Sequence, residues 1–190
     1  MFIQTETTPN HAVLKFLPGR EVLGQDGDPR EFNSAADATA SPLAEALFRI
    51  GEVRRVFFAR EFLTVTKAPD ADWAVLKAPI LAAVMDHYTG GGALMREDAE
   101  ADDSEEAYEG EAAEIVREIK DLLDTRIRPA VAQDGGDILF SRFEAKTGVV
   151  WLHMRGACSG CPSSAATLKA GVENMLRHYV PEVTRVEQTL

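Results

Sequence analysis

Residues 149–164 read Val-Val-Trp-Leu-His-Met-Arg-Gly-Ala-Cys-Ser-Gly-Cys-Pro-Ser-Ser, and this stretch places both cysteines of the chain between two elements. The apolar run at 149–154 predicts a strand, and Pro162 suits the first position of a helix. Cys158 and Cys161 lie in the loop between them. A pair with this spacing can form a redox disulfide, supply half of a metal site or pack in a core, so the surrounding residues must decide.

The position of the loop before a helix favours reactive cysteines. Backbone N–H groups and the dipole at a helix start stabilise a thiolate, and Gly156 and Gly160 permit tight turns. We therefore expect a nucleophilic loop that binds metals readily, to which Arg155 could add positive potential. Of the four histidines only His153 lies close to the loop in sequence, and we expect it to be structural or solvated.

The number of cysteines limits what one chain can bind. A 4Fe-4S cluster or a sulfur-coordinated zinc ion needs four thiolates, and this chain offers Cys158 and Cys161. Two copies related by a twofold axis can each present one loop to a shared centre. Metal binding and dimerisation would then be one event, and the exposed site would suit a cluster that is handed on.

Nine of the eleven net negative charges come from one acidic stretch. Nine of the fifteen residues from 97 to 111 are acidic and none is basic, so the flanking sequences are nearly neutral. With three glycines at 90–92, this composition predicts an acidic flexible linker at 90–110 between domains at 1–89 and 111–190. No basic face or long apolar run indicates a nucleic-acid or membrane partner. No phosphate loop or hydrolase motif appears, so we do not expect an enzyme.

The first domain is expected to contain strands at 12–17, 53–59 and 62–66, of which the last two form a hairpin. Ser41 and Pro42 start a helix, as an N-cap and a first-turn proline. Apolar residues at helical spacing along 72–88 predict a second helix. Pro79 interrupts this pattern, so we expect a short first turn, a kink and a main helix at 79–88.

The second domain is expected to run helix, strand, strand, helix, strand, with the first helix along 115–127, a turn at 134–137, strands at 138–143 and 149–154, the second helix from Pro162 and a last strand at 183–187. Pro129 should end or bend the first helix. We assign the turn at 134–137 no catalytic role. The fold class is therefore α+β, with two small α/β-type domains joined by an acidic flexible linker.

A known family matches these residues. The segments Arg-Pro-Ala-Val-Ala-Gln-Asp-Gly-Gly-Asp at 128–137, Gly-Ala-Cys-Ser-Gly-Cys-Pro-Ser-Ser at 156–164 and Thr-Leu-Lys-Ala-Gly-Val-Glu at 167–173 resemble the Nfu/NifU C-terminal domain, over residues 111–190. Residues 1 to about 88, with Met-Phe-Ile-Gln-Thr-Glu at the start and the Phe57-Phe58 hairpin, resemble the N-terminal domain of mitochondrial-type and alphaproteobacterial Nfu scaffolds.

The resemblance implies an iron–sulfur scaffold or carrier that holds a 4Fe-4S cluster at a homodimer interface. The ligands would be Cys158 and Cys161, and the cluster would come from upstream assembly machinery and pass to apo iron–sulfur client proteins. The N-terminal domain, which contains no cysteine, would dock clients or position the cluster domain. Without a targeting segment, the bacterial cytoplasm is the expected location, and the mitochondrial matrix only if a presequence has been removed.

Two other functions fit a Cys-x-x-Cys loop. A thiol-disulfide oxidoreductase could use the pair as dithiol and disulfide, although Ala157 stands where thioredoxin-like chains have an aromatic residue. Alternatively, two loops could hold one zinc ion across a dimeric adaptor. Iron, sulfide and zinc analysis separates these alternatives.

Overall fold

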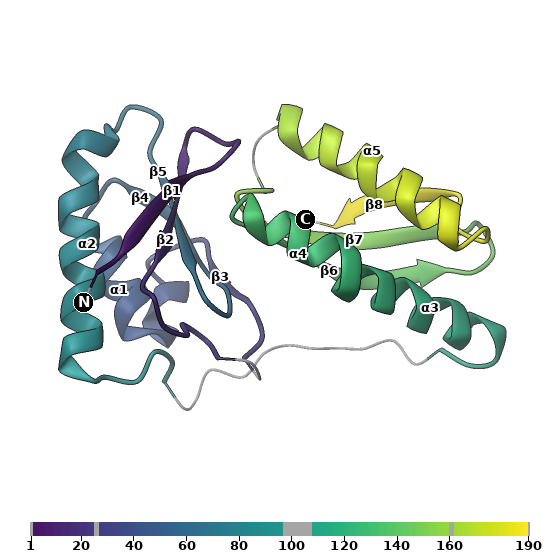
Figure 1. Ribbon diagram of the computed structural model, residues 1–190, viewed down its shortest axis with the longest axis horizontal. Coiled ribbons are helices and arrows are strands. Elements are labelled where there is room, and N and C mark those ends of the chain that lie inside the picture. The colour runs from purple at the N-terminus through teal and green to yellow at the C-terminus, as the bar shows by residue number, and fades with distance from the viewer. Residues whose placement is uncertain (1, 25–26, 97–107, 160–161, 190) are drawn as a thin grey trace. The chain divides into compact units, whose positions relative to one another are not determined.

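Two separate hydrophobic cores divide the chain into units Met1–Ala101 and Asp102–Leu190, each with its own sheet (Figure 1). The structure is a computed structural model that describes residues 2–24, 27–96, 108–159 and 162–189, with only the backbone at 162–165. Both units combine helices with a sheet, which confirms the α+β class. Within the described residues, no helix is both long and apolar enough to cross a membrane.

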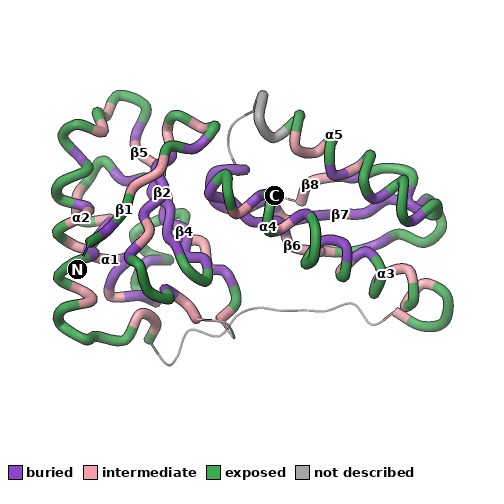
Figure 2. Tube along the Cα trace, in the orientation of Figure 1, coloured by how far each residue is buried: buried purple, intermediate pink, exposed green. Residues whose placement is uncertain are grey.

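The first unit is built on an antiparallel sheet with the strand order β1-β2-β5-β4-β3, namely β1 (Gln4–Thr7), β2 (Val13–Leu17), β5 (Leu63–Lys67), β4 (Val53–Phe58) and β3 (Arg30–Phe32). The predicted hairpin of β4 and β5 lies inside this sheet, and Phe16 and Phe58 both lie opposite Leu63. These three side chains are fully buried in the core. Figure 2 shows the strands β2 and β4 largely in the purple of buried residues. The edge strands β1 and β3 were not predicted, because they are short and polar and lack the apolar alternation that marks a strand.

Two helices complete this core: α1 (Pro42–Phe48) and α2 (Trp73–Gly90), with the short 3-10 helix η1 (Asp37–Ala40) before α1. As expected, Ser41 caps α1 and Pro42 begins it. The predicted division into a short first turn and a main helix at 79–88 was wrong, since α2 runs from its Asp72 cap through Pro79 as one helix. Proline removes the hydrogen bond to Val75, and that residue is 70% exposed, so water can satisfy the freed carbonyl.

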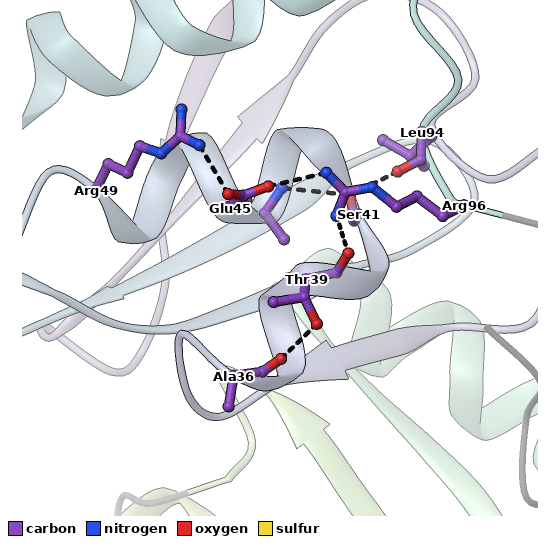
Figure 3. Close-up of polar contacts among 8 residues, drawn as sticks. Ala36, Thr39, Ser41, Glu45, Arg49, Leu94 and Arg96 are labelled. Atoms are coloured by element: carbon purple, nitrogen blue, oxygen red, sulfur yellow. Dashed lines mark hydrogen bonds and ion pairs between the residues drawn. The ribbon is translucent and has the colours of Figure 1, made fainter. Parts of the chain in front are cut away.

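Residues after α2 remain attached to the first unit (Figure 3). The Ser41 hydroxyl donates to the Leu94 carbonyl oxygen at 2.5 Å, and the Arg96 N–H donates to the Ala40 carbonyl oxygen at 2.9 Å. The Arg96 guanidinium bonds the Thr39 carbonyl oxygen and lies 2.9 Å from the Glu45 carboxylate. Part of the stretch predicted as linker therefore packs on this unit. Residues 97–107 lie outside the described range.

The second unit contains α3 (Glu111–Leu122), the π-helical turn η2 (Leu123–Ile127), α4 (Arg128–Gln133), β6 (Gly136–Glu144), β7 (Val149–Gly156), α5 (Pro162–Tyr179) and β8 (Arg185–Thr189). The central strand β7 pairs antiparallel with β6 and parallel with β8. The expected order of helices and strands is confirmed. The helical backbone does not end at Pro129. The π-helical turn η2 leads directly into α4, and Pro129 lies in the first turn of α4.

One core joins the helices of this unit to its sheet. Ile119 of α3, Val131 of α4 and Leu176 of α5 belong to the same buried cluster as Leu152 of β7 and Val186 of β8. The edge of β8 is also covered, since the Val186 N–H donates to the Glu173 carboxylate of α5 at 3.0 Å. The sheet is thereby fixed against the helices, and β7 delivers the cysteine loop from the middle of the unit.

Candidate metal centre

The cysteine loop begins where β7 ends. Gly156 has a φ of 66°, a left-handed conformation that glycine adopts without strain, and it turns the chain out of the strand. Its carbonyl oxygen accepts hydrogen bonds from the Ser159 N–H at 3.2 Å and from the Ser159 hydroxyl at 2.9 Å. This closed turn places Cys158 inside it, and the expected loop-shaping role of Gly156 is confirmed.

The Asp-Gly-Gly-Asp segment forms the other wall of the loop. Asp134 ends α4, and Gly135, with a φ of 79°, reverses the chain into β6. The Gly135 carbonyl oxygen accepts from the Ala157 N–H at 3.1 Å, and Gly136 pairs with Gly156 across the strands. The predicted turn therefore also binds the cysteine loop directly.

The thiol of Cys158 lies in the core of the unit. The residue is 6% exposed and belongs to the same buried cluster as Ile138 and Leu152. Burial, together with the negative charges of Asp134 and Asp137, raises the pKa of Cys158 to about 12. The expectation of a thiolate-favouring environment was therefore wrong for Cys158 in this conformation, because its side chain packs inward beside acidic residues.

Gly136 is a site residue that the sequence analysis missed. A Cβ atom at this position would overlap the Cys158 Sγ and would lie 3.1 Å from its Cβ. The sequence gives one signal for it: Gly136 follows Gly135, and Gly135 by itself already makes the turn. Its partner in the fold is 22 positions away, so only the pairing of β6 with β7 reveals the contact.

A partly buried ion pair supports the same turn. The Arg128 Nε donates to Asp137 Oδ1 at 2.8 Å and its Nη2 donates to Oδ2 at 3.0 Å, while Asp124 accepts from Nη1 at 2.7 Å. Burial alone would lower the pKa of Arg128, but the hydrogen bonds and charges of Asp137 and Asp124 raise it above its usual value. Arg128 therefore stays charged and holds the first residue after Gly136 in place.

Within the described ranges, the other residues near the loop do not complete a metal site. His153 lies in β7, and burial and the charge of Arg155 lower its pKa, which favours neutral imidazole. Gly160 and Cys161 lie outside the described residues. Across the described part of the chain, no three side chains of the metal-binding types His, Cys, Asp and Glu gather in one place.

Comparisons with known proteins place both units. Residues 3–91 match the family model described as the N-terminal domain of the scaffold protein Nfu/NifU, and residues 119–187 match the NifU-like domain. NifU-like proteins 4 and 5, mitochondrial, of Arabidopsis thaliana are 50% and 49% identical to this chain over 188 residues. The NFU1 iron-sulfur cluster scaffold homolog, mitochondrial, of Drosophila ananassae is 50% identical over 188 residues.

The three matches each cover 99% of this chain, and the chain spans 66%, 68% and 64% of the three relatives. The sequence identity of about 50% extends across both units, and the relatives have the two units in the same order along the chain. The resemblance seen in the residues is thus confirmed, and the chain belongs to the Nfu/NifU family of scaffold proteins.

Proposed function

We propose that this protein is an iron–sulfur cluster scaffold or carrier that holds a 4Fe-4S cluster between the Cys158 and Cys161 pairs of two copies. It releases the cluster to apo-proteins. The observation that carries the proposal is the placement of both cysteines in the strand–loop–helix of a NifU-like domain. The cluster is cargo that is bound and handed on, so the proposed role is not enzymatic.

The ligand count supports a homodimer. A 4Fe-4S cluster is held by four thiolates, and this chain has two cysteines. A second copy supplies the same loop with the same geometry, so a twofold axis through the cluster completes the site. Each thiol that binds iron loses its proton, and cluster binding is therefore coupled to pH as well as to dimerisation.

Anaerobic reconstitution of the full chain with ferrous iron and a sulfur donor tests this function. We expect four irons, four sulfides and the mass of a dimer, and we expect Cys158→Ala or Cys161→Ala to abolish all three. Ser159→Ala is the matched control, because it changes the same loop and leaves both thiols. Retention of a stable cluster by either cysteine variant, or one zinc ion per dimer in place of iron, would contradict the proposal.

The first unit serves, in this proposal, to dock client proteins or to position the cluster domain. It contains no cysteine, so it cannot ligate a cluster through thiolates. A protease site inserted within residues 97–107 allows one preparation to be compared before and after cleavage. We expect slower transfer to an apo-client after cleavage, with the cluster itself retained. An unchanged rate with every client would remove this role.

The relatives are named as mitochondrial proteins, and for this chain we propose a reducing compartment, either the bacterial cytoplasm or the mitochondrial matrix. Both compartments keep cysteines as thiols. The oxidoreductase alternative is disfavoured by Ala157, which stands before the cysteine pair where thioredoxin-like chains have an aromatic residue. An active insulin-reductase assay without iron would revive it.

A further inference from the structure

Gly136 contacts the thiol of Cys158 across the paired strands β6 and β7. This glycine is buried, and its φ is not positive, so the backbone does not require glycine at this position. Space does require it. An added Cβ would overlap the Cys158 Sγ and would lie 3.0 Å from the Arg155 carbonyl oxygen.

The sulfur that Gly136 accommodates is in the wrong place to bind a shared cluster. Cys158 is 6% exposed and packs with core residues such as Leu152 and Ile138. A cluster held between two copies needs each sulfur at the surface of its subunit. Cys158 must therefore leave the core before it can ligate iron jointly with a partner loop.

The loop has the elements for such a movement. Gly156 occupies a left-handed conformation that it can leave without a Cβ penalty. Among the described residues, the Ala157 N–H donates to the Gly135 carbonyl oxygen, and Ser159 donates to the Gly156 carbonyl oxygen, within this loop. The loop follows the last paired residue of β7, so a local opening that breaks these bonds can leave the sheet intact.

We propose that Gly136 provides a storage position for the Cys158 thiol, and that cluster binding competes with this stored position. This inference rests on the proposed function for its link to the cluster. In the stored position the thiol is kept from reagents and oxidants, and only the fraction of molecules with an open loop can accept a cluster. Gly136 is thus a positioning residue that acts through Cys158.

Thiol reactivity tests storage without any iron. In full-length protein carrying Cys161→Ser, Cys158 is the only thiol, and its rate of reaction with DTNB is measured in the folded protein and in the same protein unfolded in urea. We expect the folded rate to be far below the unfolded rate. Adding Gly136→Ala should raise the folded rate by about tenfold or more, because the new Cβ displaces the sulfur.

Two glycines of the same unit serve as matched controls. Gly148 is equally crowded but lies at the other end of the two strands, where a Cβ would overlap the Glu182 carbonyl oxygen. Gly148→Ala should destabilise the unit and leave the thiol protected. Gly171 has open space around its Cβ position in the middle of α5, so Gly171→Ala should leave the thiol protected and should stabilise the helix.

Three outcomes would overturn the storage proposal. The first is that Cys158 reacts with DTNB as fast in the folded protein as in the unfolded protein. The second is that Gly136→Ala folds and its reaction rate does not change. The third is that Gly148→Ala, at the same stability as Gly136→Ala, raises the reaction rate by the same factor. If Gly136→Ala does not fold, the comparison of folded and unfolded Cys158 still decides. A double-mutant cycle adds a second measure: Gly136→Ala should cost less unfolding free energy in Cys158→Ala than beside the native cysteine.

These readouts use no cluster, so they separate the two proposals. If the Cys158 thiol is protected but the protein takes up no iron, the inference about the loop stands and the scaffold function is rejected. If the protein takes up iron but the Cys158 thiol is exposed, the scaffold function stands and the storage position is rejected.

Discussion

Arg128 and Asp137 form a two-point ion pair, with 2.8 Å between Nε and Oδ1 and 3.0 Å between Nη2 and Oδ2. The Asp137 side chain is 8% exposed and that of Arg128 is 20% exposed. The pair ties α4 to the first residues of β6, directly beside the glycine that adjoins Cys158. The geometry of the candidate site therefore depends on a contact between charged residues that lies mostly out of water.

Arg128→Ala should reduce the unfolding free energy of the second unit by about 2–4 kcal/mol, since it leaves the Asp137 carboxylate buried without its partner. The measurement is urea unfolding of full-length protein in a Trp73→Phe background, where Trp151 fluorescence reports on the second unit. Arg117→Ala is the control, because Arg117 is exposed on α3 and should change stability by no more than about 0.5 kcal/mol. Equal effects of the two variants would refute a special role for the pair.

Arg96 should set the titration of Glu45 in the first unit. Hydrogen bonds from Arg96 and then Arg49 lower the pKa of Glu45 from its ordinary value of 4.5. Its contribution to stability is thus present above pH 4.5 and is lost as the pH falls through the lowered folded pKa. Titration of the Glu45 carboxyl carbon by NMR should show a higher midpoint in Arg96→Ala than in the native chain. A midpoint that does not move would mean that the contact is not formed in solution.

His153 should make the second unit less stable in mild acid. Burial, followed by the charge of Arg155, lowers its pKa from 6.5, so the folded state favours the neutral ring. This contribution is complete above pH 6.5 and is lost as the pH falls through the folded pKa. His153→Gln should flatten the dependence of unfolding free energy on pH in this range, measured by Trp151 fluorescence in the Trp73→Phe background. If the dependence of unfolding free energy on pH is the same in His153→Gln, then other groups cause the acid sensitivity.

Cys158 should remain protonated far above neutral pH. Burial and the charges of Asp134 and Asp137 raise its pKa from 9.0 to about 12. Since the folded pKa is raised, the contribution of the neutral thiol to stability is present below pH 9.0 and is lost between that pH and about 12. The pH midpoint at which thiolate absorbance appears should therefore be much higher in folded Cys161→Ser protein than in the same protein unfolded in urea. Coincident midpoints would show that the thiol is in water.

Local patterns were enough to predict most of the elements. The strands at 53–59 and 62–66 form the expected hairpin, and the order of elements around the cysteines agrees with the structure. The errors have local causes. Polar edge strands such as β1 lack an apolar alternation, and the effect of Pro79 depends on whether the carbonyl that it frees can reach water.

Sequence alone determined where the two cysteines lie and that one chain has too few thiols for a cluster, because spacing and ligand number are properties of the chain itself. Only the tertiary structure decided that Cys158 turns into the core, that Gly136 makes room for its sulfur and that Asp137 is held by Arg128. These contacts join residues that are brought together by strand pairing and core packing. Whether a thiol faces water or the interior is therefore decided by its neighbours in space, and its own segment does not encode it.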